Sequence, residues 1–208
     1  MLDDVTRVKR LPVAMPVAAS NRRLGRRKDA QAESVVQEAQ LAQWMTEAFA
    51  RCRPEGVFGS LAIVDNDGHK VTLSDASVIE NDGVARLLAK CQHAWLAVAT
   101  IGPELAAWVN QAMAAGDGAK AVVADAVGSE TVEAAMDVLQ SYAGTTLRRR
   151  GWQLSSKRFS VGYGGWDLSA QALFFSWLPL TDMGLRLTPS AIIEPEKTIT
   201  AIAGIRSS

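Results

Sequence analysis

Apolar residues recur at spacings of three and four along much of the chain, which is typical of helices with one buried face. The clearest such stripe consists of Val35, Ala39, Ala42, Met45 and Phe49. Turn and glycine signals bound the other stretches of this kind. We predict helices over residues 31–50, 84–91, 103–115, 119–149 and 168–178.

The longest of these helices contains an unusual pair of residues. Gly128 and Ser129 interrupt the apolar pattern of residues 119–149. A glycine inside a helix costs about 1 kcal/mol relative to alanine. We therefore expect Gly128 to be there for close packing or for a ligand.

Other apolar runs predict strands. An apolar run at 57–64, a turn at 65–68 and an alternating run at 70–73 indicate a hairpin. The continuous apolar run at 94–100 is typical of a strand that is covered on both faces. Two further strands are expected over residues 190–193 and 198–205.

The order of these elements indicates the fold class. Helices and strands interleave, but the βαβαβ order of a doubly wound sheet is missing, and residues 151–167 are glycine-rich and loop-like. We predict an α+β fold with a mostly antiparallel sheet and flanking helices.

Length and composition narrow the class of protein. The chain has 208 residues, of which 48% are hydrophobic and 21% charged, so it is neither disordered nor collagen-like. No apolar run approaches the roughly 18 residues of a membrane-spanning helix. Cys52 and Cys91 do not make a disulfide framework, so we expect a cytoplasmic protein without a membrane span.

Charge is unevenly distributed although the net charge is zero. Residues 1–28 hold eight of the 22 basic residues, two of the 22 acidic residues and two prolines. We predict an extended basic arm there, followed by a single domain over residues 29–208. A nucleic-acid arm or a transit peptide would also be basic. However, no aromatic residue interleaves with the cations and Asp3 and Asp4 are acidic, so we favour an arm that docks on the chain's own acidic body or on a partner, and no nucleic acid.

Catalytic and metal-binding signatures are scarce. His69 and His93 are the two histidines and lie far apart, which fits neither a zinc site nor a Ser-His-Asp triad. Cys52 and Cys91 have no CxxC pairing and are interpreted as small buried hydrophobes. The acidic turn at 65–68 lacks the closing glutamate of a calcium loop and is interpreted as an ordinary turn. We predict no catalytic residue and no metal site.

One glycine-rich segment carries candidate binding chemistry, because Arg158 precedes Val161-Gly162-Tyr163-Gly164. An arginine can bind a carboxylate through two parallel hydrogen bonds, glycine lets a ligand approach the backbone, and aromatic faces attract a sulfonium or other cation. The glycines lack the GxGxxG spacing of a dinucleotide loop. The segment fits either a small ligand with a carboxylate and a flat ring, or a tight turn with an anchoring tyrosine.

Five short motifs occur in an order that resembles a known family, the activation domain of vitamin B12-dependent methionine synthase, and specifically its short stand-alone relatives. The likeness spans about residues 20–205. The motifs are Thr100-Ile101-Gly102, Asp125 to Ser129 with Glu133 and Asp137, Arg158 to Tyr163, Met183 to Thr188, and Pro195 to Thr198 with Gly204-Ile205.

The resemblance implies a curved α+β domain that holds S-adenosylmethionine in a shallow groove. The family's RxxxGY motif marks that site, and Arg158, Gly162 and Tyr163 match it. The resemblance assigns Arg158 to the ligand's carboxylate and the loop from Val161 to Gly164 to backbone and ring contacts. Glu133 matches an acidic position of the family's long helix, where it would bind the ligand's amino group or pair with an arginine.

The resemblance also implies a function that needs a partner. The partner is a cobalamin-binding methionine synthase or another corrinoid protein, whose inactive cob(II)alamin is remethylated with an electron from a flavodoxin-type reductant and a methyl group from S-adenosylmethionine. The sulfonium methyl is already activated and cobalt is the nucleophile, so the domain has only to place the donor. The chain would then be an accessory component rather than a self-contained enzyme.

The chain departs from the family pattern in ways that leave alternatives open. Gly165 stands where the stand-alone relatives have aspartate, although Asp167 follows two residues later. The full-length enzyme's paired tyrosines and a cobalamin-binding DxHxxG motif have no counterpart in this chain. The alternatives are a non-catalytic docking or chaperone module for a corrinoid protein that has lost the ligand, and an unrelated small-molecule sensor, dimeric through its apolar helices.

Overall fold

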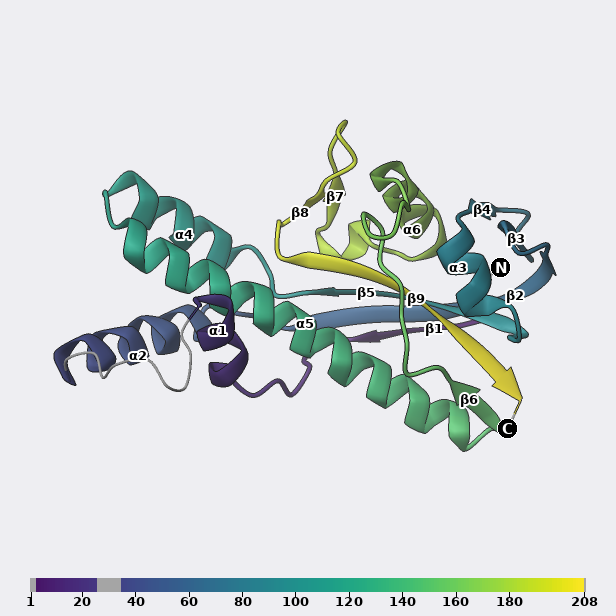
Figure 1. Cartoon of the computed structure of the whole chain (residues 1–208), viewed down its shortest axis with the longest axis horizontal. Helices are drawn as coiled ribbons and strands as arrows, with labels where there is room; N and C mark the ends of the chain where they lie inside the picture. The colour runs from purple at the N-terminus through teal and green to yellow at the C-terminus, as the bar shows by residue number, and fades with distance from the viewer. Residues whose placement is uncertain (1–2, 26–34, 208) are drawn as a thin grey trace.

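The computed structural model describes residues 3–25 and 35–207, which form helices around a curved sheet (Figure 1). The sheet has seven strands, and every pairing in it is antiparallel. They are β1 (Asp3–Val8), β2 (Glu55–Asn66), β3 (Lys70–Leu73), β4 (Val78–Glu80), β5 (His93–Thr100), β6 (Trp152–Leu154) and β9 (Thr198–Ser207). A separate hairpin consists of β7 (Arg186–Leu187) and β8 (Ile193–Glu194).

The longest helix of the described residues is α5 (Gly118–Arg148), with 31 residues. The other α-helices are α1 (Val17–Arg23), α2 (Val35–Phe49), α3 (Asp82–Leu88), α4 (Glu104–Ala114) and α6 (Gln171–Trp177). None of the helices within 3–25 and 35–207 has both the length and the hydrophobicity of a transmembrane span. The predicted helix over 31–50 is confirmed from residue 35 onward, and residues 31–34 lie outside the described part.

The strand order brings together segments that are far apart in the sequence. The order is β4-β3-β2-β5-β9-β6, so β9 lies between β5 and β6. The long strand β2 pairs with β5 along one edge, and along the other edge first with β1 and then with β3. The predicted α+β class with a curved, mostly antiparallel sheet is confirmed.

Helices cover both faces of the central strand β5, as its continuous apolar sequence predicts. Trp95, Ala97 and Ala99 pack on the α5 side. Leu96 and Val98 belong to the core on the other side, which α3 and α6 close. Side chains along a strand alternate between its faces, so a strand buried on both needs apolar residues throughout.

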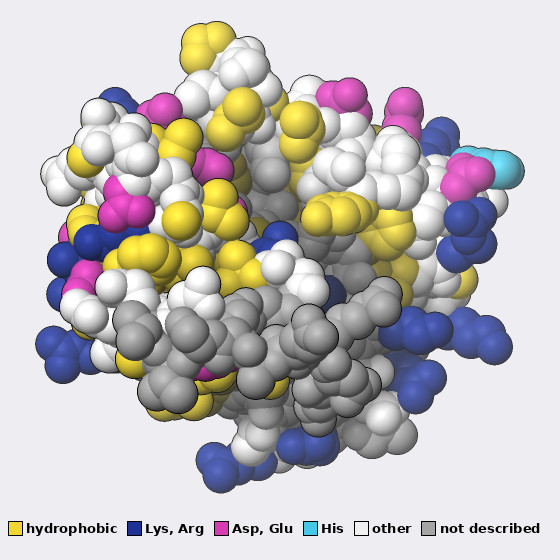
Figure 2. Space-filling view, turned by 60° about the vertical axis from the view of Figure 1, so that its left-hand side comes forward, with side chains coloured by type: hydrophobic (Ala, Val, Ile, Leu, Met, Phe, Trp, Pro, Cys, Tyr) yellow, Lys and Arg dark blue, Asp and Glu magenta, His cyan; other side chains and the backbone are white. Residues whose placement is uncertain are grey.

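The N-terminal half of α5 leaves the sheet and packs against α2 and α4 at one end of the molecule (Figure 1). The predicted helix over residues 119–149 is confirmed as α5, which continues through Gly128 and Ser129 although they interrupt the apolar pattern. The expected packing reason for Gly128 is confirmed, since a Cβ there would lie 2.6 Å from Leu105 Cδ2 of α4. Figure 2 brings this end forward and shows hydrophobic side chains among charged ones.

The basic arm is only partly extended. Residues 3–8 form β1, but the expectation of an arm without helix is wrong at 17–23, which form α1. The cations Arg22 and Arg23 occupy the last turn of α1, where they offset the negative end of the helix dipole. Arg23 also pairs with Glu130 of α5 at 2.6 Å, and residues 26–28 lie outside the described part.

Two further expectations are corrected by backbone pairing. The segment 151–167, predicted as loop, contains β6, which pairs with the end of β9. The predicted strand at 190–193 is wrong except at its last residue. Thr188 N–H bonds to the Ile192 carbonyl at 2.8 Å and Ala191 has φ 59°, so the chain turns there instead of extending.

The two cysteines differ in burial, and this difference predicts different reactivity. Cys52 is 6% exposed, and burial raises the pKa of its thiol to about 11, whereas Cys91 is partly exposed and its pKa is raised less. At pH 8 about one Cys52 thiol in a thousand would be ionised. We expect iodoacetamide to alkylate Cys91 much faster than Cys52 in the folded protein and both equally in urea, as followed by peptide mass spectrometry. Equal rates in the folded protein would contradict this.

Candidate functional site

Arg158 lies after β6 and is held by one face of α5. Its Nη1 donates hydrogen bonds to Asp137 Oδ1 at 2.5 Å and to Gln140 Oε1 at 3.0 Å, and its Nη2 donates to Glu133 Oε2 at 2.9 Å. The spacing of 133, 137 and 140 brings these three side chains to the same side of the helix. Of the two alternatives for Glu133, the pairing with an arginine is present in this structure.

The contacts with α5 leave part of the Arg158 guanidinium available. A guanidinium has five N–H donors. Three of them reach Glu133, Asp137 and Gln140, so the Nε–H and one Nη2–H have no hydrogen-bond partner among the described residues. The side chain is 21% exposed, so a ligand can reach it. The arrangement is a fixed cation with two donors for a carboxylate.

Gln140 also contacts Arg158, which the sequence analysis did not foresee. Its Oε1 accepts from Arg158, and its Nε2 donates to the Ser155 carbonyl at 2.7 Å, so it ties Arg158 and the segment after β6 to α5. The available signal was a polar residue within the apolar stripe of α5, in register with Glu133 and Asp137. An open groove of about 290 Å³ runs beside these residues, and Arg158 and Asp137 line it.

The loop from Val161 to Gly164 forms a tight turn that is anchored by its ends. Gly162 N–H bonds to the Trp166 carbonyl at 2.8 Å, and Trp166 N–H bonds to the Tyr163 carbonyl at 2.9 Å. Val161 and Trp166 are buried, whereas the Tyr163 ring is 70% exposed. The interpretation of Tyr163 as the residue that anchors the turn is therefore wrong. The buried ring that anchors it is that of Trp166. Tyr163 instead presents its ring to the surroundings.

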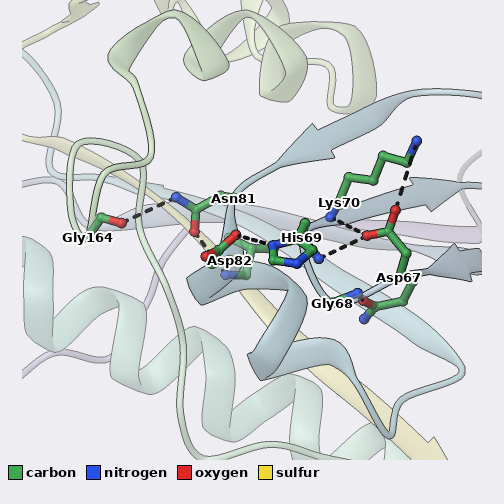
Figure 3. A network of polar contacts seen from close by, with 9 residues as sticks. Asp67, Gly68, His69, Lys70, Asn81, Asp82 and Gly164 are labelled. Atoms are coloured by element: carbon green, nitrogen blue, oxygen red, sulfur yellow. Dashed lines mark hydrogen bonds and ion pairs between the residues drawn. The ribbon is translucent and has the colours of Figure 1, made fainter.

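Backbone conformation at Gly164 and a contact from α3 fix the turn in place. Gly164 has φ +53°, and a Cβ there would lie 2.4 Å from Phe159 Cζ. Asn81 caps α3 by accepting from Val84 N–H, and its Nδ2 donates to the Gly164 carbonyl at 3.3 Å (Figure 3). The sequence analysis missed Asn81, since a residue that begins a helix gives no local sign of a second partner far along the chain.

The acidic turn near Asn81 is held by hydrogen bonds from its own backbone to the Asp67 side chain. Asp67 Oδ1 accepts hydrogen bonds from the backbone N–H groups of Lys70 and His69, each at 2.9 Å (Figure 3). These two bonds lower the pKa of the Asp67 carboxyl. In the described residues no group of three or more His, Cys, Asp or Glu side chains is placed to hold a metal ion. The side-chain oxygens of Asn66 and Asp67 accept from backbone N–H groups of Gly68, His69 and Lys70, so the segment forms the hydrogen-bonded turn that its sequence predicts.

The structure brings the candidate residues together in two groups. Arg158 and Glu133 are in contact, and Val161 to Gly164 follow Arg158 along the same segment. No hydrogen bond among the described residues joins the two groups directly. Asp167 does not replace the aspartate missing at Gly165, because its carboxylate accepts from Ser169 N–H and caps a short 3₁₀ helix, Leu168–Ala170.

A solved structure has the same architecture. The chain is similar to the MetH reactivation domain bound to AdoHcy, with a TM-score of 0.66 and 16% identity, over 97% of this chain and 78% of that chain. This likeness confirms the activation-domain-like fold that the motif order predicts. Comparisons with protein-family models and with curated proteins gave no match.

Proposed function

We propose that this protein binds S-adenosylmethionine and supplies its methyl group for the reductive remethylation of cob(II)alamin on a partner, a cobalamin-dependent methionine synthase or another corrinoid protein. The observation that carries the proposal is Arg158, fixed by α5 with two donors left over and followed by Gly162 and Tyr163 at the family's spacing. The fold is shared with a domain whose solved structure contains AdoHcy, which supports the same ligand class.

The proposed roles follow from charge and exposure. Arg158 binds the ligand's carboxylate through the two donors that α5 does not use. Glu133, which is 49% exposed, gives up its hydrogen bond with Arg158 Nη2 and binds the ligand's amino group. Asp137 and Gln140 keep their hydrogen bonds with Arg158 Nη1 and hold the guanidinium in place. Tyr163 offers an exposed aromatic face to the sulfonium or to the adenine ring.

The reaction needs placement rather than an acid or a base from this chain. The bond between the sulfonium sulfur and its methyl carbon breaks, the sulfur keeps the electron pair as a thioether, and the methyl group passes to the partner's cobalt. One electron from a flavodoxin-type reductant supplies the reduction that the remethylation of cob(II)alamin requires. An open groove suits this role, because the methyl group must remain reachable by another protein.

Replacing Arg158 by alanine tests the ligand site. We expect Arg158→Ala to weaken S-adenosylmethionine binding by about ten- to hundredfold in calorimetric titration, because a charge-assisted pair of hydrogen bonds is lost. Arg149→Ala is the matched control, since Arg149 is the exposed C-cap of α5 outside the groove. The analogue 5′-methylthioadenosine lacks the amino-acid carboxylate and α-amino group of S-adenosylmethionine, so Arg158→Ala should leave its affinity unchanged. Equal losses for both ligands would contradict the assignment.

A second substitution separates the two roles of Glu133. If Glu133 binds the amino group, Glu133→Gln weakens S-adenosylmethionine binding. If Glu133 only pairs with Arg158, Glu133→Gln frees a donor and leaves binding unchanged or tighter. We expect weakening of about tenfold for S-adenosylmethionine and none for 5′-methylthioadenosine.

The alternative function is a docking module for a corrinoid protein that has lost the ligand. Gly165, in place of the family's aspartate, and the neutralisation of Arg158 by Glu133 and Asp137 favour it. The discriminating result is no binding of S-adenosylmethionine at millimolar concentration together with a stable complex with a cobalamin-loaded methionine synthase in size-exclusion chromatography.

A further inference from the structure

Another pocket lies where α3, β6 and the end of β9 meet. Its volume is about 420 Å³, which is within the range of small-molecule pockets. Its walls come from the last turn of α3 and the residues that follow it, from the end of β9, and from residues 153–156. It shares residues 154–156 with the groove beside Arg158, so it is a separate space that adjoins the candidate site.

The charged residues in the wall of this pocket all have the same sign. Arg86, Lys90 and Arg206 line it, and the described lining includes no Asp or Glu. Neither Arg86 nor Lys90 has an ion-pair partner in the part of the chain that the structure describes. Like charges around one space repel one another, and an anion between them offsets that repulsion. The lining therefore favours an anion with more than one negative charge.

Arg206 is held in place with most of its donors unused. Its Nε donates a hydrogen bond to Gln153 Oε1 at 2.9 Å, and both residues line the pocket. The four N–H groups on its Nη1 and Nη2 have no acceptor among residues 3–25 and 35–207. Two parallel N–H groups of a guanidinium can bind two oxygens of one oxyanion. Arg206 is therefore a preformed oxyanion donor.

Hydroxyl groups and apolar side chains complete the lining. Ser155 Oγ accepts from Lys157 N–H at 3.1 Å, which leaves the Ser155 O–H able to donate, and Ser156 adds a second hydroxyl. Leu87 and Leu154 line the same pocket. A phosphate monoester offers three acceptor oxygens and nearly two negative charges at neutral pH, and its organic group can contact apolar side chains.

We propose that this pocket binds a small phosphate monoester, with its phosphate among Arg86, Lys90 and Arg206 and its organic group against Leu87 and Leu154. Inorganic phosphate has the same charged group without the organic one, so the test includes both. The proposal does not depend on S-adenosylmethionine binding, because none of these five residues has a role in that site.

Cys91 provides a signal for occupancy of the pocket. It lies in the wall, next to Gly204 of β9, where the missing side chain leaves the space that Cys91 Sγ occupies. Burial raises the pKa of this thiol, and the positive charge of Arg206 lowers it. A phosphate beside Arg206 would cover the thiol and offset that charge, and both effects slow alkylation.

The probe is phenyl phosphate, and phenyl sulfate is the control with a similar shape and only one negative charge. Affinity is measured by calorimetric titration of the full chain at pH 8 and constant ionic strength, so that screening does not differ between ligands. The rate at which iodoacetamide alkylates Cys91 is measured by peptide mass spectrometry. We expect saturable binding of phenyl phosphate, at least tenfold slower alkylation of Cys91 at saturation, and at least tenfold weaker binding of both phenyl sulfate and inorganic phosphate.

Two pairs of variants locate the phosphate. Arg206→Gln removes a lining cation, and Arg149→Gln makes the same change at the exposed C-cap of α5, outside the pocket. Lys90→Gln and Lys157→Gln form the second pair, because Lys90 lines the pocket and the exposed Lys157 does not. We expect Arg206→Gln and Lys90→Gln each to weaken phenyl phosphate at least fivefold and the two controls to leave its affinity unchanged.

Several outcomes would overturn the proposal. No saturation by phenyl phosphate at millimolar concentration would do so, as would binding that leaves the alkylation rate of Cys91 unchanged. Equal losses in the lining and control variants would mean that only the overall charge attracts the ligand. Equal affinity for phenyl phosphate and phenyl sulfate would exclude a site for a dianion, and equal affinity for phenyl phosphate and inorganic phosphate would exclude recognition of an ester. If Arg206→Gln does not fold, the Lys90→Gln pair decides alone.

Discussion

Replacing Phe174 by alanine is expected to destabilise the folded protein by about 3–5 kcal/mol. Phe174 is fully buried in α6 and lies between two tryptophans, with ring centroids 6.1 Å from Trp166 and 5.3 Å from Trp177. Truncation removes the transfer free energy of the ring and leaves a cavity that these rigid neighbours cannot fill. Urea denaturation followed by tryptophan fluorescence measures the loss.

Phe175 is the matched control for this substitution. It is the next residue of α6 and only partly buried against the same core. Phe175→Ala should cost less than half as much, because solvent replaces part of its surroundings. If the two variants lose the same free energy of unfolding, the row of aromatic rings is not what stabilises this face of the sheet.

The second large effect is expected at Gly164, where alanine should cost about 2–4 kcal/mol of stability. The left-handed backbone conformation accounts for part of the cost, and collision with Phe159 accounts for the rest. The Phe159 ring cannot move away easily, because the same end of the ring also lies against Gly83, where a Cβ would be 2.8 Å from it. The loop must then shift, so S-adenosylmethionine binding should fall as well.

Gly165→Ala is the matched control, because it tests the cost of the left-handed backbone conformation without a collision with a neighbouring side chain. Gly165 also has a positive φ, +77°, but nothing lies within 4 Å of a Cβ built there. Gly165→Ala should therefore cost only about 1–2 kcal/mol. Thermal unfolding of the two variants measures the difference, and calorimetric titration should show that Gly165→Ala retains more of the ligand affinity. A larger loss at Gly165 would mean that the ring of Phe159 does not confine the turn.

Much of the fold could be predicted from local patterns. The apolar run of β5 indicated burial on both faces, and the stripe of α5 indicated a helix of the observed length. The failures have a common physical cause. β6 is three residues long and exists because β9 pairs with it, and α1 forms where it packs against α5. Pairing between distant segments leaves no periodicity in the short segment itself.

The candidate site was predictable to a similar extent. Arg158 and Glu133 were predicted as candidate site residues, and they form a hydrogen bond. Arg158 also bonds to Asp137 and Gln140, and the motif alone did not assign these two contacts. The sequence could not predict that Trp166 is buried and Tyr163 exposed, because both residues are aromatic and they lie only three positions apart. Their roles depend on which of them the turn directs toward the core.

The position of β9 in the sheet has a consequence for how the chain must be made. β5 is among the most apolar segments of the protein, and one of its two edges is closed only by β9. During synthesis β2 can pair with β5 early, but the other edge stays open until α4, α5 and the loops behind them have left the ribosome. An open apolar edge is a template for pairing with another chain. Solubility of the newly made protein therefore depends on how fast the ten residues of β9 pair with the open edge of β5.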